Sequence, residues 1–228
     1  PCQPDDMIGS MVYFPLVGAV VGALMALAGW LGYALTGSYI AAAALMVLCD
    51  VLVTGGIHMD GLGDTCDGFF SGRDCARIME IMHDSRMGTF GALGVILTLM
   101  LKFAFICAAL ERLGMAALGL TFAAPVLSRM CVVLLEKIGV SARDGMGSAY
   151  VKGMSWRRVR EAYALGAVLI LLVKPVALLG APAACVLALG FNSYFNRKIG
   201  GLTGDTLGAA NELCALAMYA LAALRFVA

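Results

Sequence analysis

The sequence has little charge and only two histidines, and both shortages exclude classes of function. Charged residues make up 14% of the chain, with 16 Lys and Arg against 15 Asp and Glu. This charge is too sparse to cover a soluble surface or to form a basic patch, so we expect no nucleic-acid partner. With only His58 and His83 present, and the eight cysteines scattered without a C-x-x-C pair, the pattern disfavours a zinc site and predicts reduced thiols.

Hydrophobic residues are abundant instead, at 61% of the 228 residues. Soluble domains have roughly 45–50% apolar residues, so lipid is the solvent that this composition fits. Long apolar runs without strand-like alternation predict an all-α, polytopic integral membrane helical bundle of about seven spans, forming one membrane-embedded domain over 1–228. The expected spans are Val12–Leu35, Tyr39–Val53, Gly91–Leu110, Met115–Leu135, Ala162–Leu179, Pro182–Phe195 and Ala209–Val227.

The basic residues are distributed unevenly between the two predicted sides of the membrane. Most of them fall in the long connections, whereas the short connections and the C-terminus hold only Arg112 and Arg225. The positive-inside rule then makes the long connections cytosolic, and any polar chemistry faces the cytosol. The long connections are 1–11, 54–90, 136–161 and 196–208.

Three aspartates, Asp60, Asp64 and Asp67, follow a spacing of i, i+4, i+7 after the second span. On a helix they would share one face and repel one another, unless solvent or a hard cation such as Mg²⁺ compensates. A solvated acidic loop is the alternative. Neighbouring His58 is interpreted as a base, as a hydrogen-bond donor that supports the acidic residues, or as a structural histidine.

The segment 74–91 has an amphipathic pattern that predicts a helix at the membrane surface. At its end, Ser85 and Arg86 precede Gly88, where a guanidinium and exposed amides could hold phosphate. Two further basic residues, Lys102 and Arg129, lie within predicted spans. Each is a candidate functional residue, with internal pairing or snorkelling as the alternative.

A glycine-rich turn precedes the last span, and amides at a helix start can bind an anion. Asp205 follows within this turn, either as a metal ligand or as a helix cap. The candidate substrate-binding residues of the turn are Gly200, Gly201, Thr203 and Gly204.

Three motifs, with the opening YFPLVG (13–18), closely resemble the cobalamin synthase family, adenosylcobinamide-GDP ribazoletransferase. They are GGIHMDGLGDTCDG (55–68), EIMHDSRMGTFGA (80–92) and GGLTGDTLGAA (200–210). The resemblance implies a bacterial cytoplasmic (inner) membrane enzyme that joins adenosylcobinamide-GDP to α-ribazole or its 5′-phosphate. The products are adenosylcobalamin or its 5′-phosphate and GMP, with Mg²⁺ required. Because family members carry a further stretch before the equivalent of Tyr13, we expect a shortened N-terminus here.

On this resemblance we assign Asp60 and Asp64 to magnesium. Asp67 would bind a second metal or orient the nucleophilic hydroxyl, and Asp205 would complete the cluster. Arg86 and the turn 200–204 would hold phosphates. Two rivals remain, a phosphatidyltransferase-like enzyme and an ion-coupled transporter; the latter predicts paired broken helices and carboxylates near mid-membrane. The sequence leaves a homo-oligomer open.

Overall fold

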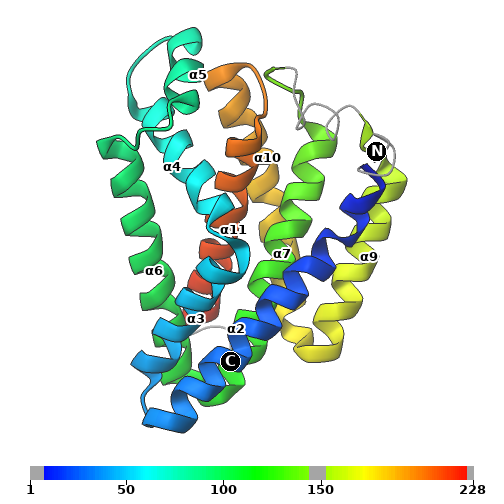
Figure 1. The fold of residues 1–228 in the computed structure, drawn as a ribbon. Helices are drawn as coiled ribbons and strands as arrows, with labels where there is room; N and C mark the ends of the chain where they lie inside the picture. Colours follow the sequence, from blue (N-terminus) through cyan, green and yellow to red (C-terminus); the bar gives the residue numbers. More distant parts are fainter. Residues whose placement is uncertain (1–7, 144–152, 225–228) are drawn as a thin grey trace.

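The computed structural model describes residues 8–143 and 153–224, and within these ranges the chain is almost entirely helical (Figure 1). They contain no strand, only an isolated bridge between Ser141 and Leu202. The all-α prediction is therefore confirmed, while residues 1–7 and the end of the last predicted span lie outside the described part. The elements are η1 (Met11–Tyr13), α2 (Phe14–Thr36), α3 (Tyr39–Thr54), α4 (Ile57–Phe70), α5 (Cys75–His83), α6 (Thr89–Leu113), η2 (Gly114–Ala116), α7 (Ala117–Ile138), α9 (Trp156–Val173), η3 (Pro175–Leu179), α10 (Gly180–Ile199) and α11 (Gly204–Ala223).

All seven predicted spans coincide with helices, but their number as membrane crossings is not confirmed. Among the described residues, four helical stretches are long and apolar enough to cross, or up to five if α3 and α4 form one broken span. One of the four, Thr89–Ile138, contains both α6 and α7, which run in opposite directions in Figure 1. The fifth predicted span breaks at Pro175, where α9 has ended and η3 begins, because proline cannot continue the hydrogen-bond ladder.

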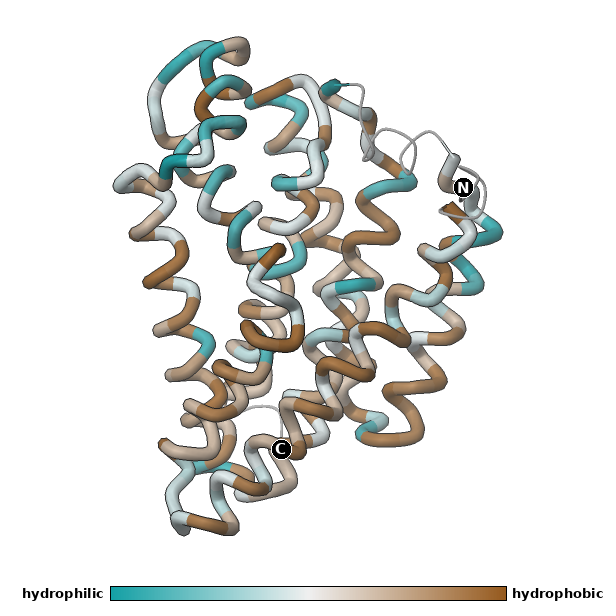
Figure 2. Tube along the Cα trace, viewed as in Figure 1, coloured by the Kyte–Doolittle hydropathy of each residue, from teal (hydrophilic) through white to brown (hydrophobic). Residues whose placement is uncertain are grey.

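Hydrophobic residues predominate along most of the length of the helices (Figure 2), and many of the large ones are exposed. Leu27 of α2, Leu97 of α6, Leu172 of α9 and Leu189 of α10 are all exposed. Hydrophilic residues instead gather near α5 at one end of the bundle in Figure 2. Large apolar side chains over a whole belt fit contact with lipid, and the protein is a multi-pass membrane protein.

The centre of the bundle is formed by α7 and α11, which pack against each other and against most other helices. Helix α2 approaches α7 unusually closely at two glycines. A Cβ atom at Gly18 would lie 2.4 Å from the carbonyl oxygen of Pro125, and one at Gly22 equally close to that of Phe122. Only glycine fits at these two positions, so α2 and α7 touch backbone to backbone.

The connection 54–90 is largely helical and begins with a sharp bend. Gly55 and Gly56 have φ angles of 62° and 71°, a left-handed conformation that glycine adopts without strain. Helices α3 and α4 meet there at 90°. As a result α4 leaves the direction of α3 and packs along α11 and α6, bringing the first acidic motif into the bundle.

Candidate active site

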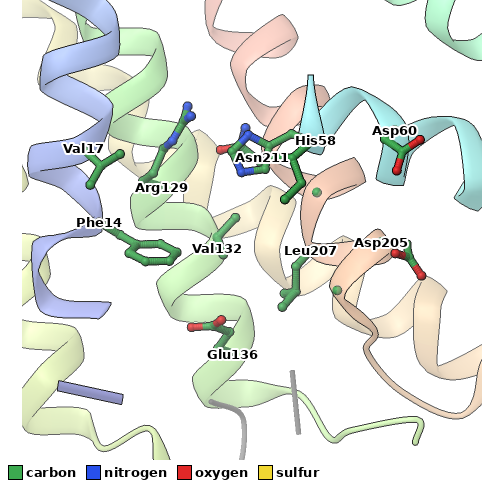
Figure 3. A pocket seen from close by; sticks show the side chains of 13 residues that line it. Phe14, Val17, His58, Asp60, Arg129, Val132, Glu136, Asp205, Leu207 and Asn211 are labelled. Carbon is green, nitrogen blue, oxygen red and sulfur yellow. The ribbon is translucent and has the colours of Figure 1, made fainter. Parts of the chain in front are cut away.

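A cavity of about 410 Å³ lies between α2, α4, α7 and α11 (Figure 3). It collects five residues that the sequence pointed to, from three separate stretches of the chain: His58, Asp60, Arg129, Gly204 and Asp205. The remaining lining residues are Phe14, Val17, Ile57, Val132, Glu136, Leu207, Gly208 and Asn211.

Asp60 of α4 and Asp205 of α11 line this cavity, whereas Asp64 of α4 lies near them without lining it. A Cβ atom at Gly61 would lie 2.8 Å from the backbone oxygen of Asp205, so the two helices touch backbone to backbone. The negative charges of Asp60, Asp205 and Asp67 all act on Asp64. Among the described residues, neither exposed Asp60 nor half-buried Asp64 has a hydrogen bond or ion pair. Neighbouring carboxylates without a cationic partner repel one another, and a hard cation would relieve this repulsion.

The side chains of these acids do not surround a common position. Within residues 8–143 and 153–224, no group of three or more His, Cys, Asp or Glu side chains is arranged to hold a metal ion. Asp67 in particular is engaged elsewhere, because its two oxygens accept hydrogen bonds from the N–H groups of Gly88 and Gly91, at 2.7 and 2.8 Å. It thereby caps the start of α6 and ties that helix to α4, a structural role that its spacing did not reveal.

The start of α11 is capped by Thr203, not by Asp205. The Thr203 hydroxyl accepts from the Thr206 N–H and the Thr206 hydroxyl from the Thr203 N–H, a capping box. The cap alternative for Asp205 is therefore wrong. Asp205 instead lies 3.7 Å from the guanidinium of Arg143, a residue that the sequence analysis did not single out.

The rest of the glycine-rich turn has a structural task. Gly200 ends α10 in a left-handed conformation with φ 74°, and its N–H bonds to the Asn196 carbonyl. Gly201 packs directly on the backbone of 140–142, which pairs with Leu202. Of the predicted phosphate-binding turn, only Gly204 lines the cavity.

Ser85 and Arg86 are exposed and do not line the cavity. The Arg86 guanidinium bonds to the Asp84 carboxylate, with the shortest contact at 2.6 Å. These hydrogen bonds stabilise the ionised form and lower the pKa of Asp84 to about 2. The structure therefore separates this arginine from the acids that line the cavity.

Beneath the cavity lies a buried network of opposite charges. Lys102 of α6, 1% exposed, donates to Asp50 of α3 at 2.7 Å and to Glu212 of α11 at 2.5 Å. Arg129 of α7 bonds to the hydroxyl of Ser128 and has the charges of the same two acids near it. His58 is also close: its Nδ1 lies 4.0 Å from Glu212 and has no hydrogen-bond partner in the part of the chain that the structure describes.

Lys102 is therefore paired inside the protein, one of the two alternatives to a functional role. Arg129 lies near the same acids and also lines the cavity. No sequence motif singled out Asp50, Glu136, Asn211 and Glu212, although each is a polar residue in or beside an apolar span. Such residues are expensive in a membrane, and this signal could have identified them.

Comparison with known proteins identifies the family to which this chain belongs. The model of the family described as cobalamin-5-phosphate synthase matches residues 1–223. The adenosylcobinamide-GDP ribazoletransferase of Clostridium kluyveri is 34% identical over 220 residues, 93% of this chain and 84% of the relative. The enzymes of the same name from Citrobacter koseri and Klebsiella pneumoniae are 37% and 39% identical, over 92% and 90% of this chain and 85% and 83% of theirs. No solved structure matches. The family expected from the three motifs is confirmed: this chain belongs to the cobalamin-5-phosphate synthase family.

Proposed function

We propose that this protein transfers a phospho-linked cobinamide from adenosylcobinamide-GDP to α-ribazole or α-ribazole 5′-phosphate, releasing GMP. The observation that carries the proposal is the cavity in which acids from α4 and α11 meet Arg129 and a helix start. Membership of the family and the names of its relatives support the same reaction. A pyrophosphate substrate needs a site of this kind, because its charge must be neutralised while one phosphorus is attacked.

Magnesium fits the residues present at this site. Asp60 and Asp64 are carboxylates one helical turn apart without a partner among the described residues, and Asp205 approaches them from α11. Oxygen ligands of this kind, one or two carboxylates plus substrate phosphates, are those that Mg²⁺ prefers. When bound, the ion would neutralise the pyrophosphate and hold it in position. We assign Asp60 and Asp205, which both line the cavity, to the ion, keep Asp64 as an alternative carboxylate on α4, and give Asp67 the positioning of α4 against α6.

The phosphate oxygens also need donors, and the cavity supplies them. The N–H groups of Gly204 and Asp205 open α11, where a helix leaves its amides without intrahelical partners. Arg129 lines the cavity, and Arg143 lies beside Asp205. We propose that these groups hold the phosphates, in place of Arg86, Gly200, Gly201 and Thr203.

The reaction itself needs no covalent enzyme intermediate. A ribose hydroxyl oxygen of α-ribazole forms a bond to the phosphorus that bears the cobinamide, and the bond from this phosphorus to the oxygen bridging to GMP breaks. The hydroxyl proton must leave as the new bond forms. We assign it to His58, which lines the cavity. Its buried Nδ1, without a hydrogen-bond partner among the described residues, lies 4.0 Å from the Glu212 carboxylate, which would stabilise the imidazolium.

We further propose that the cavity faces the cytosol of a bacterial cytoplasmic membrane. Figure 1 places α5 and the α10–α11 connection at one end of the bundle, and the α2–α3 and α6–α7 connections at the other. The first end contains most of the basic connections, which the positive-inside rule assigns to the cytosol. A homo-oligomer stays a prediction.

The direct test is a reconstitution. Purified protein in lipid nanodiscs with Mg²⁺, adenosylcobinamide-GDP and α-ribazole should form GMP and the corrinoid product in equal amounts. Asp60→Ala should abolish GMP release while leaving thermal unfolding unchanged, because Asp60 is exposed and unpaired among the described residues. Asp84→Ala, in the connection between α5 and α6 and away from the cavity, is the control aspartate and should retain turnover. Near-normal turnover by Asp60→Ala would refute the assignment.

An ion-coupled transporter shares two features with this structure, a broken helix pair and buried carboxylates. Here, however, the buried acids Asp50 and Glu212 are compensated by Lys102 and Arg129. Flux of a solute across proteoliposomes without nucleotide chemistry would favour the transporter, and stoichiometric GMP favours the transferase.

A further inference from the structure

The cavity contains one carboxylate that the proposed phosphate and magnesium site does not use. Glu136, near the end of α7, is 2% exposed and lines the cavity. Its Oε2 atom is buried without a hydrogen-bond partner, and no ion pair involves it among the described residues. Its neighbour Lys137 is directed elsewhere, to the carbonyl of Met154 and the ring of Trp156.

A buried carboxyl without partners reduces stability, so its presence beside a cavity indicates a ligand that completes its hydrogen bonds. The surroundings describe this ligand. In Figure 3, Glu136 lies with Phe14 and Val132 on one side of the cavity, apart from Asp60 and Asp205 on the other. The first side offers an aromatic ring and aliphatic carbon around a single carboxyl, which suits a flat heterocycle attached to a group with hydroxyl donors.

We infer that Glu136, Phe14 and Val132 form a ribonucleoside subsite, in which the Glu136 carboxyl hydrogen-bonds ribose hydroxyls while the base packs against Phe14. The inference deepens the proposed function, on which it rests for the identity of the ligand. A carboxylate has two oxygens for two neighbouring hydroxyls, and acidic side chains bind the ribose of dinucleotides in the same manner. The phosphate end of the nucleoside then points towards the acids and amides at the opposite side. Both proposed substrates contain a ribonucleoside, α-ribazole in one case and guanosine in the other.

The test uses Glu136→Gln, which keeps the volume of the side chain, and Glu161→Gln, an exposed control glutamate in α9. Binding of α-ribazole and of GDP to the protein in nanodiscs is measured by calorimetry, and KM is measured for each substrate. We expect Glu136→Gln to weaken one of the two nucleosides by about tenfold, the size of a hydrogen bond to a charged group, and to leave the other unchanged. The nucleoside whose affinity falls is the one that occupies the Glu136 subsite. Glu161→Gln should change neither.

The 2′-deoxy analogue of the affected nucleoside gives a second measurement. On the wild-type protein, the deoxy analogue should bind about tenfold more weakly than the parent nucleoside. On Glu136→Gln, the analogue and the parent should bind equally well, because the substitution and the deoxygenation remove the same hydrogen bond. Thermal stability of Glu136→Gln should be equal or higher, since an unpartnered carboxyl is removed. Unchanged affinity for both nucleosides, an equal loss for both, or the full deoxy effect in Glu136→Gln would overturn the inference. Because the binding arm needs no turnover, it is independent of the GMP assay that tests the proposed function.

Discussion

Replacing Lys102 by Met should destabilise the protein more than any other single loss of a lysine. The ammonium is 1% exposed and holds two carboxylates from two other helices, at 2.7 and 2.5 Å. Methionine fills similar space but removes the ammonium to which Asp50 and Glu212 are both paired, so their negative charges lose their closest described compensation. Removing one partner of a buried ion pair typically costs about 3–5 kcal/mol, and we expect a loss in this range.

The assay is a reversible unfolding titration with sodium dodecyl sulfate in mixed micelles. Lys198→Met is the matched control, because half-buried Lys198 makes one hydrogen bond, to the Phe69 carbonyl at 2.9 Å, and its loss should cost about 1 kcal/mol. The double variant Lys102→Met/Glu212→Gln should recover part of the loss, since one uncompensated charge is removed. A cost for Lys102→Met below that of the control, or no recovery in the double variant, would refute the argument that charge pairing holds these helices together.

Three further changes have defined outcomes. Gly61→Ala should separate α4 from α11 and lower turnover by about 10²-fold, as misplacement by an ångström does, whereas Gly190→Ala, where a Cβ meets open space, should change GMP release little. Asp67→Asn should weaken the cap of α6 and cost about 0.5–2 kcal/mol in the same unfolding titration, with an unaltered magnesium requirement as the sign that Asp67 is not a ligand. Arg86→Gln should raise the pKa of the Asp84 carboxyl from about 2 towards its ordinary value of 3.8, followed by NMR titration, with unchanged turnover; a pKa that stays near 2 would contradict the pairing.

Much of the fold follows from the sequence, because apolar runs of span length leave the backbone no alternative to helix in a membrane. Each predicted apolar run lies in a helical part of the described chain. The number of crossings does not follow, since α9 combines a basic first turn with an apolar remainder and α3 is continued by α4 after a right-angle bend. Composition alone does not reveal where such helices enter or leave the bilayer.

The candidate site was predictable where one helix carries the pattern and not where two helices must meet. The spacing of Asp60 and Asp64 placed them on one face of α4, and the glycine-rich start of α11 directed attention to Asp205. The spacing could not tell that Asp67 turns to the amides of α6, because this depends on a contact more than 20 residues away along the chain. The partners of Lys102 were hidden for the same reason.

In the proposed site, acids from two separate helices, α4 and α11, share one magnesium ion. The most direct measurement is the magnesium concentration for half-maximal GMP release by Asp60→Asn, Asp205→Asn and the control Asp84→Asn. We expect the first two to raise this concentration at least about tenfold each, in line with the loss of a carboxylate from a metal site, and the control to leave it unchanged. An unaltered magnesium requirement in either Asp60→Asn or Asp205→Asn would contradict the claim.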